Sequence, residues 1–162
     1  DVKLVLLQHA DGRLALERGD VEAWAGLDPL MAAAEIESGA RLFHRKAADN
    51  TWGVLNVREE LAEKNPELVR KVLKAYEEAR AIALANPAEV RKALVEATKL
   101  SDAVIERQLT RTELTHSNIG PAQAETILAA GLALQQAGVL PASTDVKAAV
   151  DALLDRRFAA TN

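Results

Sequence analysis

The chain contains no cysteine, and this absence excludes several kinds of site. A disulfide framework, a thiolate metal site and a cysteine nucleophile all require this residue. The absence does not identify a cellular compartment, because many exported proteins also lack cysteine.

Aromatic residues, long apolar runs and clustered basic charge are also scarce. Aromatic residues make up only 3% of the chain, so we expect an aliphatic core in which Trp24 and Trp52 stand out. No uninterrupted apolar run approaches the roughly 20 residues of a membrane-spanning helix. The formal net charge is -4, whereas a nucleic-acid-binding domain usually presents a basic face. We therefore exclude nucleic acid as a partner.

The first third of the chain alternates short apolar runs with helical patterns. With 49% hydrophobic residues in 162, the chain can bury a core. Asp11 and Gly19 fit the N-cap and the left-handed C-terminal residue of a helix, and Asp28-Pro29 begins a second helix that Gly39 ends. The apolar, partly β-branched runs between and around them predict strands at residues 2–7, 21–27, 41–43 and 52–57.

From Arg58 onward, helical periodicity replaces the strand pattern. Helices are predicted at 58–64, 66–85, 87–100, from Ser101 onward, 121–137 and 145–158. Three- and four-residue spacings on the longest helix predict one buried stripe of Val69, Val72, Leu73, Tyr76, Ala79, Ile82 and Ala83. The predicted fold class is therefore α/β and helix-rich, with short strands near the N-terminus and a helical C-terminal half.

The segment from Gly19 to Pro29 is the strongest candidate for a binding site. Asp28 is suited to cap the following helix, and its carboxylate could also pair with a ligand ammonium. Trp24 is either a core residue or an apolar wall of a pocket. Gly26 favours the second role, because a small residue lets a ligand approach the backbone.

Histidines and basic residues give weaker signals. His9 follows the first predicted strand and is either a cleft-edge residue or a solvated loop histidine. His44-Arg45-Lys46 could steer an anion, but such a run is usually a solvated turn. The sequence contains no nucleophile elbow, zinc-protease motif or phosphate-binding glycine loop, so we predict no enzyme activity, no metal and no cofactor.

Three segments resemble the sulfonate, taurine and nitrate periplasmic binding proteins of ABC importers. The first runs from Ala15-Leu16 through Gly19-Asp20-Val21-Glu22-Ala23-Trp24 to Asp28-Pro29, the second is Trp52-Gly53-Val54-Leu55-Asn56-Val57 with Arg58-Glu59-Glu60-Leu61, and the third is Asn65-Pro66-Glu67-Leu68-Val69 with the later Asn86-Pro87. They span most of residues 14–90. Where many sulfonate binders have a tryptophan before Asp-Pro, this chain has Leu27, which leaves the identity of the ligand open.

The resemblance implies the C-terminal part of a two-lobed solute-binding protein. Residues 1–48 would be the remainder of the second ligand-binding lobe, and residues 49–162 would be the return strand and C-terminal helices of the first. It also implies closure of the lobes around a small anion (an aliphatic sulfonate, taurine or a nitrate-like ion), contact with the membrane subunit of an ABC importer and a periplasmic location. Trp24, Gly26 and Asp28 would contact the ligand, with His9 and Trp52 near the cleft and hinge.

Two further expectations follow from incomplete lobes. Apolar edges would be exposed, and a second copy of the chain or a companion N-terminal piece would cover them. The alternative hypothesis is a helical protein–protein interaction domain without a small-molecule ligand.

Overall fold

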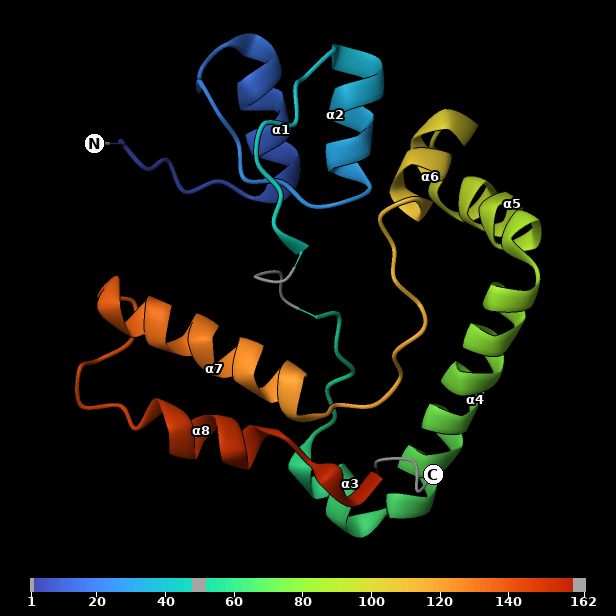
Figure 1. Cartoon of the computed structure of the whole chain (residues 1–162), viewed down its shortest axis with the longest axis vertical. Helices are drawn as coiled ribbons and strands as arrows, with labels where there is room; N and C mark the ends of the chain where they lie inside the picture. The colour runs from blue at the N-terminus through green and yellow to red at the C-terminus, as the bar shows by residue number, and fades with distance from the viewer. Residues whose placement is uncertain (1, 48–51, 159–162) are drawn as a thin grey trace. The chain divides into compact units, whose positions relative to one another are not determined.

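A computed structural model describes residues 2–47 and 52–158. These residues divide into two units, one made of residues 2–44 and 81–114 and the other of residues 45–47, 52–80 and 115–158. These units reflect contacts within this chain, and the predicted boundary between lobes near residue 48 stays a prediction. Figure 1 labels the helices of both units.

The first unit is a cluster of short helices. It contains α1 (His9–Arg18), α2 (Leu30–Ser38), α5 (Pro87–Thr98), α6 (Asp102–Leu109) and the end of α4 (Pro66–Ala85). Helix α2 contacts both α1 and α6, and α5 contacts α6. Its core is formed by Ala32 and Ala33 against Val104, with Leu100 packed beside them. Alanine side chains let the backbones of α2 and α6 approach closely. Because α2 contacts both α1 and α6, it is the central helix of this unit.

The second unit contains α3 (Glu59–Lys64), most of α4, α7 (Pro121–Gln136), α8 (Val146–Leu153) and η2 (Arg156–Phe158). Helices α7 and α8 lie side by side (Figure 1). Their approach is close at Gly131, where an added Cβ would lie 2.6 Å from Cγ1 of Val146. The Gln135 side-chain amide donates to the carbonyls of Pro141 and Thr144, which fixes the connection between the two helices.

Most helix boundaries lie where the sequence predicts them. Gly19 and Gly39 end α1 and α2 with φ of 76° and 67°, in the left-handed region that favours glycine. The Ser101 hydroxyl accepts a hydrogen bond from the Val104 amide and so caps α6. Asp11 is not an N-cap, because α1 begins two residues earlier and places it in the first turn.

The predicted α/β fold class is wrong. None of the described residues forms a strand, and the segments 2–7, 21–27, 41–43 and 52–57 have no regular secondary structure. A strand is stabilised by the ladder of hydrogen bonds to a neighbouring strand, and apolar composition alone does not supply that neighbour. Val2, Leu4 and Leu6 are largely exposed.

The predicted buried stripe on α4 is also wrong for most of its members. Val69 is buried, but Val72, Tyr76 and Ile82 are exposed. Periodicity shows that a helix has an apolar face, but that face is buried only where another element packs against it. None of the helices in the described part of the chain has the length and apolar character needed to cross a membrane.

Truncation of Ile105 should distinguish the packed core from this exposed face. Ile105 is 0% exposed, so Ile105→Ala should lower the free energy of unfolding by about 2–5 kcal/mol. Ile82→Ala is the matched control, since Ile82 is also helical but 59% exposed, and it should cost well under half as much. Denaturant titrations followed by circular dichroism would measure both, and equal losses would contradict this assignment of the core.

Candidate functional site

The loop before α2 places Trp24 against two glycines. A Cβ added to Gly12 would lie 2.6 Å from Nε1 of Trp24, and one added to Gly26 would lie 2.5 Å from Cη2. Both distances are too short for real atoms, so the indole ring occupies the space that side chains would take at these positions. Trp24 itself is half-buried. The ring is therefore held between α1 and its own loop, with part of its surface accessible.

Asp28 serves both the helix and an ion pair. Its Oδ1 accepts a hydrogen bond of 2.9 Å from the Ala32 amide in the first turn of α2, although Pro29 and not Asp28 is the N-cap residue. The same oxygen lies 3.5 Å from Nη1 of Arg111. The Asp28 carboxylate is thus already engaged by an amide and a guanidinium.

Arg111 joins two carboxylates of the first unit. Its Nη2 forms an ion pair with Oε2 of Glu35 on α2, and its Nη1 faces Asp28. The Arg111 side chain is 10% exposed, and those of Asp28 and Glu35 are each 17% exposed. Charges this poorly hydrated are stabilised by their partners, so this cluster fixes the start of α2 relative to the segment after α6.

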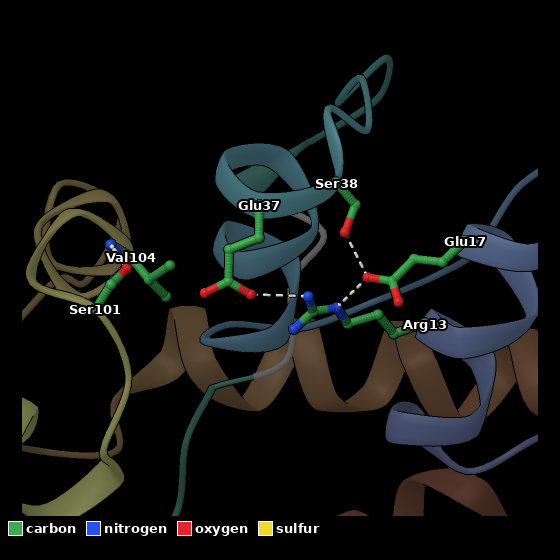
Figure 2. Close-up of polar contacts among 6 residues, drawn as sticks. All are labelled: Arg13, Glu17, Glu37, Ser38, Ser101 and Val104. Carbon is green, nitrogen blue, oxygen red and sulfur yellow. Dashed lines mark hydrogen bonds and ion pairs between the residues drawn. The ribbon is translucent and has the colours of Figure 1, made fainter.

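A second network holds α1 against α2. Figure 2 shows the Arg13 guanidinium between Glu17 and Glu37, with Nε donating to Glu17 at 2.7 Å and Nη2 to Glu37 at 2.9 Å. The Ser38 hydroxyl also donates to Glu17. These bonds, first from Ser38 and then from Arg13, lower the pKa of the Glu17 carboxyl below its usual value.

The remaining predicted site residues are distributed over both units. His9 is the exposed first residue of α1. Trp52 belongs to the second unit, where its ring meets the His116 ring edge-on with centroids 5.9 Å apart. His44, Arg45 and Lys46 are exposed. The structure therefore brings Trp24 against Gly26, and Asp28 follows at the end of the same loop.

Sequence reasoning missed Arg111 and Glu35. They are 76 residues apart in the chain, and neither belongs to a local motif, so only the packing of α2 near the end of α6 reveals the pair. The single available signal was the position of Arg111 directly after a predicted helix, and charged residues are common at such positions. Among the described residues, no group of three metal-ligating side chains could hold a metal ion.

Comparisons with known proteins give one partial likeness. No family model matches the chain, and no solved structure matches it. A protein of Escherichia coli (strain K12) named "Putative aliphatic sulfonates-binding protein" is 34% identical to it over 83 residues. The match covers 51% of this chain and 26% of that protein, so the chain spans about a quarter of its relative's length. The relative is named for binding.

Removal of the Arg111 charge should destabilise the first unit. Arg111→Met leaves Asp28 and Glu35 side by side without their cation and should cost about 3 kcal/mol of unfolding free energy. Arg91→Met is the matched control, because Arg91 pairs with Asp102 and Glu106 in a more exposed setting, and it should cost far less than Arg111→Met. Adding Glu35→Leu to Arg111→Met should recover part of the loss, and an additive double variant would contradict the coupling.

The space around Trp24 gives a second prediction. Gly26→Ala should destabilise by about 1–3 kcal/mol, because its Cβ would overlap the indole ring. Gly53→Ala should be nearly neutral, since an added Cβ meets nothing within 4 Å there. In a Trp24→Ala background the cost of Gly26→Ala should disappear. Thermal denaturation of the four variants would measure this, and an unchanged cost in that background would show that the ring is not the obstacle.

Proposed function

We propose that this chain is part of a solute-binding protein that takes up a small sulfonate or a related oxyanion. The observation that carries the proposal is the 34% identity over 83 residues with the aliphatic sulfonates-binding protein of Escherichia coli. That protein's name describes binding, so we propose a binding role for this chain and no catalytic step.

The geometry of the Trp24 loop supports an apolar contact with such a ligand. The ring is fixed by its neighbours Gly12 and Gly26, so little conformational entropy would be lost when a ligand packs against its accessible surface. An alkyl chain next to the sulfonate group is the chemistry that an indole face accepts. Trp24 and Gly26 would therefore form the apolar wall of the site.

The charge of Asp28 also bears on the proposal. An isolated carboxylate would repel an anion, but the Ala32 amide and Arg111 already offset this one. Asp28 would then mainly fix the loop that carries Trp24, and it would offer a ligand ammonium a remaining lone pair. His9 and Trp52 are proposed as secondary contacts, because the resemblance places them near the cleft and hinge.

The finer parts of the proposal concern the whole protein. Lobe closure, delivery to the membrane subunit of an ABC importer and an extracytoplasmic location are proposed by analogy with the binding proteins that the sequence resembles. The chain spans about a quarter of its relative. We propose that the helix N-terminus whose free amides bind the anion lies in a part of the solute-binding protein that corresponds to the rest of this relative.

One observation favours the alternative, a helical interaction domain. Leu68, Val72 and Tyr76 follow one another at helical spacing on α4 and are all exposed. Such a stripe is typical of a helix that packs against a partner protein. An interaction domain gives no reason for the protein to respond to small sulfonates.

Tryptophan fluorescence would separate the two functions. The chain has two tryptophans, so Trp52→Phe leaves Trp24 as the single reporter and Trp24→Phe leaves Trp52. Taurine, a short alkanesulfonate, nitrate and sulfate would be titrated against both variants, with thermal melts in parallel. We expect a saturable change from Trp24 with a sulfonate and a rise of several degrees in melting temperature near saturation. Flat titrations with all four anions would favour the interaction domain.

A further inference from the structure

One face of α1 has a shallow depression that the proposed anion site does not use. It has a volume of about 260 Å³. It is lined by Asp11, Leu14, Ala15 and Arg18 on α1, by Val5 and Leu7 before the helix, and by Asp20 and Val21 after it. These α1 residues recur at three- and four-residue spacings, so they share one side of the helix. Arg13 and Glu17, which bond to α2, are centred about 130° around the helix axis from the centre of these four residues. This face, which we call the Leu14 face, is therefore left open by α2.

The charges of the Leu14 face are arranged symmetrically. Asp11 and Arg18 lie at its two ends, about two helical turns or about 10 Å apart along the axis, with Leu14 and Ala15 at the midpoint. That separation is too large for the two to pair with each other. Both side chains are exposed, and neither has an ion-pair partner among residues 2–47 and 52–158.

The apolar centre of this face pairs a large residue with a small one. Leu14 is 44% exposed and projects from the helix, whereas Ala15 beside it is 9% exposed and lies at the depression. A two-fold axis through the midpoint would set the Leu14 side chain of one copy over the depression at Ala15 of the other. Val5 and Leu7, which are about half exposed, would extend the apolar contact on both sides.

We propose that the Leu14 face binds the same face of a second copy of this chain, with the two α1 helices antiparallel. In that arrangement Asp11 of each copy meets Arg18 of the other, so one pair of residues supplies two ion pairs. The contact is isologous, and it closes as a dimer. A small ligand could fill the depression but would not reach both Asp11 and Arg18. A second copy contacts both of these charges and the apolar centre at the same time.

Asp20 gives this model a distinguishing consequence. It also lines the depression and follows Arg18 by two residues, so the partner's Asp11 would approach two groups of opposite sign. Removing the Asp20 charge should therefore strengthen association. A purely apolar contact between copies would respond only through the smaller general repulsion that the net charge of -4 produces.

Sedimentation velocity over a series of protein concentrations tests the dimer with charge-swapped variants of the whole chain. Asp11→Arg and Arg18→Asp each turn both ion pairs into like-charge contacts and should raise the dissociation constant by about tenfold or more. The double variant Asp11→Arg/Arg18→Asp restores both pairs with reversed sign and should return it to within about threefold of the original. Asp20→Asn should lower it.

Controls address folding and general charge effects. Lys92→Asp reverses an exposed charge on α5 and should leave the dissociation constant unchanged. Circular dichroism and thermal melts of each variant would show that it is folded, and Leu14→Glu provides a second disruption that leaves Asp11 and Arg18 intact. A wild-type chain that stays monomeric at all accessible concentrations would overturn the proposal. A double variant as weak as its single variants would do the same.

Discussion

The ion pairs of Arg111 are the constraint on which the first unit depends. Asp28 precedes α2, Glu35 lies within it, and Arg111 follows α6, so one guanidinium ties together segments that are far apart in the chain. Burying three charges is costly unless each has a partner, which restricts the arrangements open to these segments. The loop that carries Trp24 ends at Asp28, and its position is therefore set by electrostatics as well as by packing.

The helices were predictable because their ends carry local chemistry. A glycine at a left-handed position, a serine that accepts from an amide and Asn-Pro pairs before helices all act within a few residues. Ser101, Gly19 and Gly39 are such signals, and the backbone bears out each one. Asp28 shows the same principle inside the candidate site, since its hydrogen bond to the Ala32 amide follows from its place before α2.

What could not be predicted depends on partners distant in the chain. The run from Val2 to Leu7 has strand composition, yet a strand exists only where a second one offers hydrogen bonds. The α4 stripe has helical periodicity, yet Val72 and Tyr76 are exposed because no element in the described part of the chain covers them. Arg111 likewise depends on distant partners, which in its case are charged. Its identity is ordinary in the sequence, and its role arises only when α2 and α6 pack together.

The close approach of α7 and α8 limits which residues evolution can place there. Gly131 has room for no Cβ while Val146 keeps its branched side chain. Any larger residue at position 131 would therefore need a smaller one at position 146, and the two positions would change together among sequences that share this hairpin. The pair is thus a covariation signature by which a distant sequence could be tested for the same α7 and α8 arrangement, independently of any binding residue.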